Sequence, residues 1–472
     1  MKQLATVVFS LGILGLFYLD RDRDARSSKA LWIPVMWLWI AGSRNVGQWL
    51  QMSSPMDQGG GRYLEGNPID RAVLGILMAL GVIVLLTRER QVKALLKGSM
   101  PVLLFFLYCA ISSLWSDYPD VAFKRWFRGL GDIVMVLVIL TAPDWSSALK
   151  RVLARVAFVL LPLSVLLIRY FPDLGRGYNI AGSAMFWTGV TTDKNGLGMI
   201  CLIFGLGTVW NFTEIYQDRE GAQRPRHLMA QGITVLTTLW LLWESNSMTS
   251  ISCFVLGGCL MMAIGGWPKT RRPAVACSLA AAAVAISAFV LFGGAGSVLQ
   301  AMGRNPTLTG RTEVWDVLLP FTQNPIIGSG YESFWLGDRL KKIWDLTSVG
   351  INEAHNGYLE IYLNLGWVGI ILLAFLIATG FRKVLRGVRE DPATGKVRLA
   401  YFVLTLIYNF TEAAFKMMSP VWMFFLIAIM AQPTPAVSEE PVRAGLYPNE
   451  GFTGLNARPK YALDARIPKA PS

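Results

Sequence analysis

The chain has 472 residues, of which 53% are hydrophobic and 16% carry a charge, and its formal net charge is +13. A soluble globular protein carries charges on about a quarter of its residues, so this composition excludes an ordinary soluble enzyme. It indicates a polytopic integral membrane protein of the all-α class, with a helix bundle embedded in lipid.

Apolar runs close to the length of a bilayer span recur along the chain and predict about 12–13 transmembrane helices. The first run lacks a small-residue cleavage site and ends in a charged segment, so we expect a retained helix rather than a signal peptide. The weakest runs are 30–50, which contains Arg44, and 129–142, which is short. The predicted spans are residues 3–19, 30–50, 72–87, 99–116, 129–142, 152–171, 195–212, 228–243, 249–266, 274–293, 357–380, 399–415 and 418–431.

Lysine and arginine gather in alternate short loops, which the positive-inside rule assigns to the cytoplasm. Topology therefore explains much of the net charge, and no nucleic-acid partner is expected. The basic loops are residues 20–29, 88–97, 219–226, 269–272 and 382–389. The opposite, outward loops are residues 51–71, 117–128, 172–194, 244–248, 294–356 and 416–417.

This alternation predicts four regions in the chain. They are N-terminal membrane helices (1–293), one large outward loop containing short helices (294–356), C-terminal membrane helices (357–431) and a polar tail (432–472). The Pro-rich tail is expected to be cytoplasmic and disordered. All five cysteines fall inside apolar runs, which predicts small buried hydrophobes rather than disulfides or a metal site.

Some outward loops keep cations that topology does not explain. In the loop 117–128, Lys124, Arg125 and Arg128 fall on one helical turn beside aromatic residues. The segment is either an interfacial amphipathic stretch with extended basic side chains or an anion site near the outer boundary of the membrane.

The next outward loop contains Arg176 and ends at Lys194 and Asn195, where another apolar run begins. Asp193 or Thr192 is the expected N-cap of that helix. The N–H groups at a helix N-terminus favour an anion, so Lys194 is a second candidate for anion binding. The alternative is a simple helix cap.

The large outward loop is the strongest candidate site. It opens with TGRTEVWDVLLPF, which predicts a short amphipathic helix with Arg311 in its first turn, and a turn-rich segment follows. It ends at His355, one of only two histidines, where the next membrane helix begins. An ionisable group at this boundary can do proton chemistry. The alternatives are a salt bridge of Arg311 with Glu313 or Asp316, and a helix-capping role for His355.

The segments GRTEVW, NPIIGSGYESF and EAHNGYLEIYLNLGWVG together resemble the large periplasmic loop of the O-antigen ligase and polysaccharide polymerase superfamily. TDKNGLG and SNSMTS, each before a predicted helix, are similar to the same group, particularly its ExoQ-like exopolysaccharide polymerase branch. The resemblance covers residues 125–415 and is strongest at 310–369. Relatives often carry a histidine before the lysine of KNGLG, where this chain has Asp193.

The resemblance implies a GT-C-like glycosyltransferase in the bacterial inner membrane, with its active site facing the periplasm. The donor would be a glycan on undecaprenyl pyrophosphate. The acceptor would be a hydroxyl of another lipid-linked repeat unit in a polymerase, or of lipid A–core in an O-antigen ligase. The ExoQ-like patterns favour a polymerase, with membrane lipid, a chain-length regulator and export proteins as further partners. A flippase or transporter is the alternative class, but the internal repeats expected of it are not evident.

The outward cations suggest how a pyrophosphate leaving group is stabilised. Its departure develops negative charge, and the sequence offers no tight pair of acidic residues in an outward loop to hold a metal. Arginine gives permanent, bidentate contacts to phosphate, so no metal and no cofactor are expected. The predicted clamp consists of Arg311 with candidates Arg125, Arg128, Arg176 and Lys194.

His355 is the expected general base for the acceptor hydroxyl, because an imidazole with a pKa of about 6.5 titrates near neutral pH. Neighbouring cations are expected to lower this pKa and keep the ring neutral. Direct displacement with inversion at the anomeric carbon is the reaction that the resemblance implies. The expected supporting residues are Asn195, Glu353 and Asn356.

Overall fold

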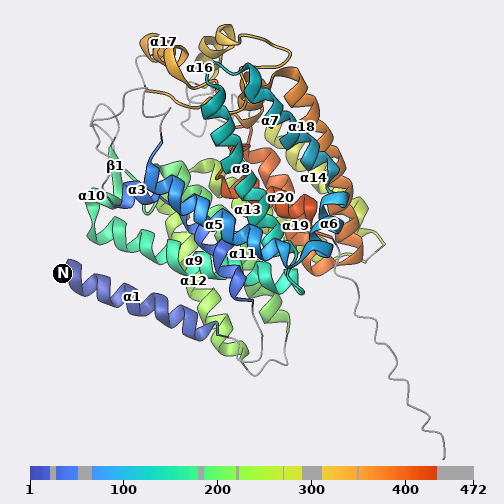
Figure 1. Ribbon diagram of the computed structural model, residues 1–472. Helices are drawn as coiled ribbons and strands as arrows, with labels where there is room; N and C mark the ends of the chain where they lie inside the picture. The colour runs from blue at the N-terminus through green and yellow to red at the C-terminus, as the bar shows by residue number, and fades with distance from the viewer. Residues whose placement is uncertain are drawn as a thin grey trace, which may run out of the picture. The chain divides into compact units, whose positions relative to one another are not determined.

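The computed structural model describes residues 1–21, 28–50, 66–178, 185–218, 223–268, 270–289, 311–347 and 350–432, and Figure 1 shows how these elements are arranged. The described chain is almost entirely helical, as predicted. The exception is one antiparallel pair of short strands, β1 (Arg176–Tyr178) and β2 (Met185–Trp187). Beyond Gln432, the predicted tail lies outside the described residues, as do 51–65 and 290–310.

The described elements occur in the following order along the chain. Before the large loop come α1 (Lys2–Leu19), η1 (Lys29–Leu31), α2 (Trp32–Ala41), α3 (Val46–Trp49), α5 (Pro68–Leu86), α6 (Glu89–Gly98), α7 (Met100–Ser112), η2 (Ser113–Trp115), α8 (Pro119–Leu140), α9 (Trp145–Tyr170), α10 (Pro172–Gly175), α11 (Lys194–Gln217), α12 (Arg224–Ser245), α13 (Met248–Gly265) and α14 (Arg272–Phe289). The large loop holds α16 (Arg311–Leu318), η5 (Leu319–Phe321) and α17 (Gly337–Thr347). The chain then continues with α18 (Gly357–Glu390), α19 (Pro392–Tyr408) and α20 (Pro420–Met430).

Each predicted span overlaps a helix, and the molecule is a multi-pass membrane protein. Within the described ranges, six helices are long and apolar enough to cross a bilayer, namely α1, α5, α9, α11, α13 and α18. A seventh span would combine α6 and α7 across an 85° bend, and α2, α14 and α20 contain shorter apolar helices. The expectation of 12–13 spans treated every apolar run as a full crossing, whereas several runs form helices that are too short or too charged to pass this test.

Contacts between connecting segments separate two ends of the bundle. Segments predicted to be cytoplasmic bond to one another, through Arg226 with the Tyr18 carbonyl, Gln231 with Asp20 and Lys383 with the Gly98 carbonyl. At the other end, Arg125 of the predicted outward loop 117–128 bonds to the Glu332 carbonyl of the large loop, and Arg44, in the predicted span 30–50, bonds to the Gly189 carbonyl of the outward loop 172–194. Asn195 and Glu412, near the outward ends of two predicted spans, bond to each other. These contacts agree with the predicted alternation of loops.

The predicted outward loop 117–128 is mostly helical. It forms the first turns of α8, which continues without interruption through the predicted span 129–142. Its cations interrupt the apolar sequence pattern but not the helical backbone. The Trp126 indole donates to the Phe106 carbonyl at 2.9 Å. The helix therefore carries its basic first turns directly out of the core.

The connection 409–419 between α19 and α20 is longer than the predicted loop 416–417. The Asn409 side chain accepts from the backbone N–H groups of Ala414 and Phe415, which holds this segment in a non-helical turn. Its apolar residues are buried, so its composition resembled the end of a membrane helix. The predicted ends of spans 399–415 and 418–431 were wrong for this reason.

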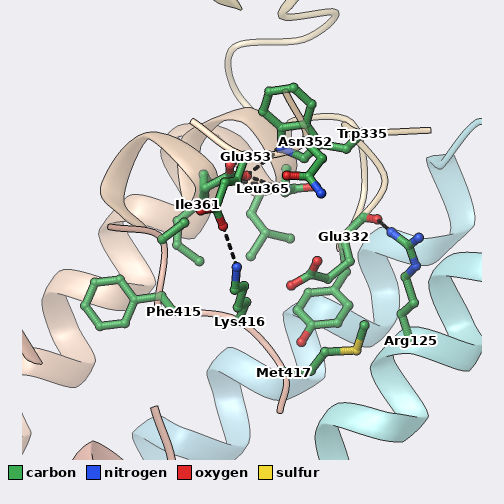
Figure 2. A pocket seen from close by; sticks show the side chains of 14 residues that line it. Arg125, Glu332, Trp335, Asn352, Glu353, Ile361, Leu365, Phe415, Lys416 and Met417 are labelled. Atoms are coloured by element: carbon green, nitrogen blue, oxygen red, sulfur yellow. Dashed lines mark hydrogen bonds and ion pairs between the residues drawn. The ribbon is translucent and has the colours of Figure 1, made fainter. Parts of the chain in front are cut away.

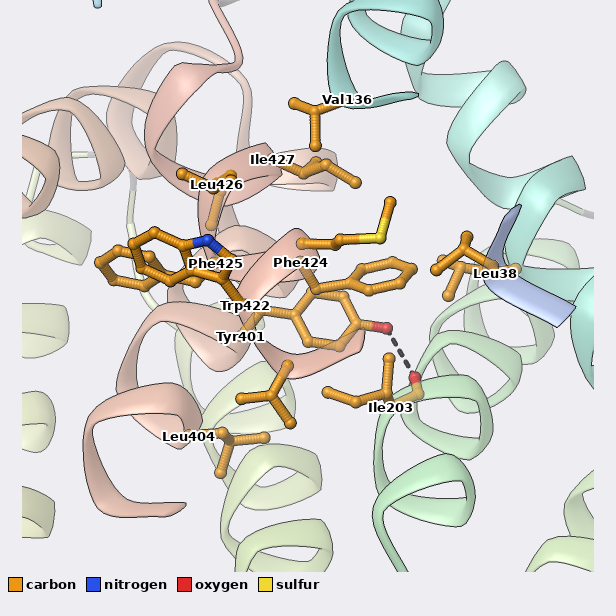
Figure 3. Close-up of a cluster of buried hydrophobic side chains, with 14 of the residues drawn as sticks. Leu38, Val136, Ile203, Tyr401, Leu404, Trp422, Phe424, Phe425, Leu426 and Ile427 are labelled. Carbon is orange, nitrogen blue, oxygen red and sulfur yellow. Dashed lines mark hydrogen bonds between the residues drawn. The ribbon is translucent and has the colours of Figure 1, made fainter. Parts of the chain in front are cut away.

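Helix α20 anchors this connection because all of its residues are buried. Figure 3 shows its aromatic residues packed against α19 and α11, where the Tyr401 hydroxyl donates to the Ile203 carbonyl at 2.8 Å. Phe424 lies 4.9 Å from the Tyr401 ring, between centroids. A close-packed interior of this kind transmits little movement, so the connection at the end of α20 is held in place.

The large loop docks onto a kink in α18. Gly366 has φ 64° and interrupts the helix, and the next two N–H groups donate to the carbonyls of Pro325 and Ile326. A Cβ at Gly366 would lie 2.3 Å from the Ile326 carbonyl oxygen. Glycine is required here by both its conformation and its closeness to the loop. Figure 1 shows α16 and α17 together at this end of the molecule.

Candidate active site

His355 lies immediately before α18 in a cluster of charged side chains. Its Nδ1 is 3.1 Å from Glu353 Oε1 and 3.4 Å from Glu412 Oε2. Lys416 Nζ lies 2.6 Å from the other oxygen of Glu353. Asn195 donates from its amide to Glu412 Oε1 at 3.0 Å. The large loop, the start of α11 and the 409–419 connection therefore meet at one histidine.

Neighbouring residues fix the backbone on both sides of His355. Asn356 caps α18 by accepting from the N–H groups of Tyr358 and Leu359, each at 3.0 Å. The Ala354 carbonyl accepts from the Trp315 indole of α16 at 2.8 Å. His355 itself has φ 48°, a left-handed conformation that is uncommon for a non-glycine residue. Asn356, and not His355, is therefore the helix cap.

Gly357 allows the 409–419 connection to approach His355. Its N–H lies 2.8 Å from the Asn409 carbonyl and 3.1 Å from the Glu412 carbonyl. A Cβ at this position would lie 1.9 Å from Asn409 Oδ1. This close approach places Glu412 beside the imidazole.

Gly357→Ala is therefore expected to move Glu412 away from His355, lower glycan transfer at least tenfold and destabilise the fold by about 1–3 kcal/mol, as overpacking does. Thermal unfolding and transfer by the purified protein would be measured together. Gly350→Ala is the matched control, because a Cβ there meets nothing within 4 Å. Equal activity and equal melting of the two variants would contradict this role for Gly357.

Two cavities adjoin this cluster and share Asn352 and Glu353 as a common wall. The larger cavity, of about 670 Å³, is lined by Met185, Phe186, Trp187, Asp193, Lys194, Asn195, Glu244, Ser245, Asn246, Asn352, Glu353 and His355. It brings together four of the residues predicted from the sequence: Lys194, Asn195, Glu353 and His355.

The smaller cavity, of about 200 Å³, lies on the other side of Glu353. Figure 2 shows Arg125 and Lys416 on its walls, with Arg125 donating to the Glu332 carbonyl and Lys416 paired with Glu353. The predicted cation Arg125 is thus separated from His355 by the Glu353 side chain, and Lys416 is a cation that the sequence analysis did not select.

The remaining predicted cations have other positions. Arg176 donates to the Ile168 carbonyl at 3.3 Å and stacks on the Trp187 ring at 4.8 Å, so it stands behind the larger cavity rather than on its wall. Arg128 lies in α8 and lines neither cavity. Arg311 begins α16, and its side chain lies outside the described residues. Of the two predicted caps for α11, Asp193 is the one that accepts from Gly196.

The expected pKa shift of His355 is reversed. Hydrogen bonds to Glu353 and then Glu412 raise its pKa to about 9, against the effect of burial. Burial would raise the pKa of the Glu353 carboxyl, but Lys416 and His355 hold it well below its usual range. The prediction that cations surround the imidazole was wrong, because two carboxylates separated by 59 positions converge on it.

Glu353, His355 and Glu412 are also the described residues that could hold a metal ion, since one ligand atom from each lies within 4.8 Å of the others. No acidic pair is evident here in the sequence, because Glu412 comes from a distant segment. In the structure both carboxylates contact the His355 ring, and Glu353 is also paired with Lys416.

Glu412 and Lys416 were missed because their segment was predicted to be the end of one membrane helix and the start of the next. Both are ionisable groups near the outward end of an apolar run. In a membrane protein that position alone indicates a functional site, and it was the available signal.

Comparison with known proteins addresses the same region. Residues 233–374 match the family model described as O-antigen ligase, and this segment contains the large loop and His355. A curated relative, "Exopolysaccharide production protein ExoQ" of Rhizobium meliloti (strain 1021), is 26% identical over 314 residues, which cover 64% of this chain and 69% of the relative.

Both matches support a relationship of the chain to the O-antigen ligase and polysaccharide polymerase superfamily. The resemblance to ExoQ is in keeping with the ExoQ-like patterns in the sequence. The segment matched by the family model ends at residue 374, so it includes Glu353 and His355 but neither Glu412 nor Lys416. One carboxylate partner of the histidine, Glu353, therefore lies inside the matched segment, and the other, Glu412, lies outside it.

Proposed function

We propose that the protein is an inner-membrane glycosyltransferase that polymerises lipid-linked glycan repeat units at the periplasmic face for exopolysaccharide production. One observation carries the proposal: His355, oriented by two carboxylates, lines the larger of two adjoining cavities at the end of the bundle assigned to the periplasm. The ExoQ relative supports exopolysaccharide as the product class. Membrane lipid, a chain-length regulator and export proteins remain the proposed partners.

The proposed reaction is a direct displacement. His355 Nε2 accepts the proton of the acceptor hydroxyl, and the resulting oxygen attacks the anomeric carbon of the donor glycan. The bond from that carbon to the pyrophosphate oxygen breaks, and undecaprenyl pyrophosphate leaves with the bonding electrons. Attack from the face opposite the leaving group inverts the anomeric centre.

The ring geometry supports Nε2 as the basic nitrogen. Nδ1 faces Glu353 and Glu412, which favours the tautomer with the proton on Nδ1 and stabilises the imidazolium once Nε2 is protonated. The raised pKa makes His355 a stronger base than a free imidazole. It also means that the base form becomes more abundant as the pH rises toward about 9.

Arg311 is proposed as the principal contact to pyrophosphate, and the two cavities contribute further charged groups. The larger cavity presents the carboxylates of Asp193, Glu244 and Glu353 against Lys194 and His355. The smaller cavity presents three carboxyl groups against two cations, Arg125 and Lys416. We assign the clamp to Arg311, because a guanidinium makes bidentate contacts to phosphate, with Lys194 of the larger cavity and Arg125 of the smaller one as assisting cations.

Arg311→Lys is expected to lower transfer roughly 10²-fold or more, because lysine keeps the charge but cannot make the bidentate contact to the developing phosphate charge. Polymer length and abundance would be measured in cells and transfer with purified protein. Lys342→Arg, on α17 of the same loop, is the control for a basic substitution away from the site. Full activity of Arg311→Lys would contradict the proposal that Arg311 makes a bidentate contact to the pyrophosphate.

An O-antigen ligase is the second candidate, and the description of the matching family model favours it. Deletion of the gene separates the two functions. Loss of high-molecular-weight exopolysaccharide with intact O-antigen is expected for the polymerase. Loss of O-antigen from lipopolysaccharide, with normal exopolysaccharide, would overturn the polymerase assignment in favour of the ligase.

A further inference from the structure

We propose that the larger cavity binds the terminal sugars of the acceptor glycan, with β2 providing an aromatic stacking platform. This inference rests on the proposed function, because it assigns one substrate of that reaction to one of the two cavities. The reaction itself requires only that an acceptor hydroxyl reach His355. The platform determines which acceptor does so.

The platform consists of Phe186 and Trp187, next to Met185, at one wall of the cavity. Sugar rings present flat faces of C–H groups, and these pack against aromatic rings. The partner strand holds both rings in place. The Arg176 guanidinium lies over Trp187 at 4.8 Å, and Gly177 pairs with Phe186 so closely that a Cβ would lie 2.4 Å from the ring. A rigid aromatic surface loses little conformational entropy when a ligand binds.

The remaining walls carry groups that bind hydroxyls. Asn246 comes from the turn between α12 and α13, and Asn352 comes from the large loop. Side-chain amides can donate to and accept from sugar hydroxyls, and carboxylates accept from them. A cavity with an aromatic wall and convergent polar groups is suited to a ligand with apolar faces and a polar rim.

The charge of this cavity separates acceptor from donor. Of its carboxylates, Glu244 is ion-paired with Arg169 and Glu353 with Lys416, so the described lining presents Asp193 and Lys194 beside His355 rather than a cluster of cations suited to a pyrophosphate. A neutral sugar needs no such cluster. Because His355 lines the same cavity as the platform, a sugar held on the platform presents its hydroxyl to the proposed base. The volume of about 670 Å³ admits a short oligosaccharide.

Binding of lipid-free oligosaccharides to the purified full-length protein tests this inference. One probe is the set of short oligosaccharides released by partial hydrolysis of the cell's own exopolysaccharide, and a second is the core oligosaccharide of its lipopolysaccharide. Neither probe contains pyrophosphate. Titration would be followed calorimetrically with the His355→Ala protein, so that no transfer occurs during the measurement.

Trp187→Ala in this background is expected to weaken binding at least tenfold, whereas Trp187→Phe, which keeps an aromatic face, is expected to weaken it less than threefold. Tyr178→Ala is the matched control, since Tyr178 is exposed on the partner strand and lies outside the cavity wall. In the active protein, Tyr178→Ala should leave the maximal rate unchanged, and Trp187→Phe should raise the KM for the acceptor.

Binding of neither probe, or equal binding by Trp187→Ala and Tyr178→Ala, would overturn the platform. Trp187-dependent binding of either probe supports it, and the probe that binds identifies the acceptor class. The proposed function fails by a different result, namely unchanged surface polysaccharides in the deletion strain. If the protein makes polymer but binds no lipid-free glycan, the proposed function therefore stands and the platform proposal fails.

Discussion

His355→Ala is expected to lower glycan transfer by roughly 10²- to 10⁴-fold, the range that a positioned acid–base group contributes. The substitution removes the proposed proton acceptor, but the backbone around it remains held by Asn356 and by the Trp315 contact to Ala354. The protein should therefore remain inserted and abundant. Polymer in cells and transfer by purified protein are the measurements.

The other histidine provides the control. His227 lies in α12 among segments assigned to the cytoplasmic end, so His227→Ala is expected to leave transfer within a few-fold of the unaltered protein. Near-normal polymer from His355→Ala, or equal losses in both variants, would contradict the assignment of His355 as the essential base.

Glu412→Gln is expected to have the second large effect, because it removes one of the two charges that raise the pKa of His355 while keeping a similar shape. Loss of the acidic partner of a catalytic histidine costs up to about 10⁴-fold in rate. In the unaltered protein, the rate should rise between pH 7 and about 9 as the imidazolium releases its proton. In Glu412→Gln this rise should move to lower pH. The measurement is the pH dependence of transfer for both proteins.

The same pKa shift has a consequence for stability. A histidine whose pKa is raised on folding stabilises the fold fully below its unfolded pKa of about 6.5. This stabilisation is lost as the pH rises through about 9.

Glu313→Gln, at an exposed position of α16, is the control for Glu412→Gln and should leave the pH dependence of transfer unchanged. A rate that falls between pH 7 and 9 would show that His355 acts as a cation and not as a base.

The sequence contained most of the fold because membrane helices are marked by local composition. The ends of helices were harder to predict. The start of α8 is charged yet helical. Its charged side chains can reach water, so they do not interrupt the backbone hydrogen bonds of the helix. The 409–419 connection is apolar yet non-helical, because Asn409 satisfies its backbone groups. Composition and backbone conformation diverge at both places.

The candidate site was predictable where its residues lie in one segment. His355, Glu353 and Asn356 belong to the large loop and the helix that follows, and the KNGLG segment gave Lys194 and Asn195. Glu412 was not selected because its closeness to His355 depends on a Gly357 contact that no local pattern shows. The direction of the pKa shift was missed for the same reason, since the sequence displayed the outward cations but not the converging carboxylates.

The most direct test is reconstitution of the purified full-length protein in liposomes with repeat units linked to undecaprenyl pyrophosphate, in the presence of EDTA. The account predicts polymer formation with inverted anomeric configuration, and release of undecaprenyl pyrophosphate in equal number with new glycosidic bonds. A requirement for a divalent metal, or transfer solely to added lipid A–core, would contradict it.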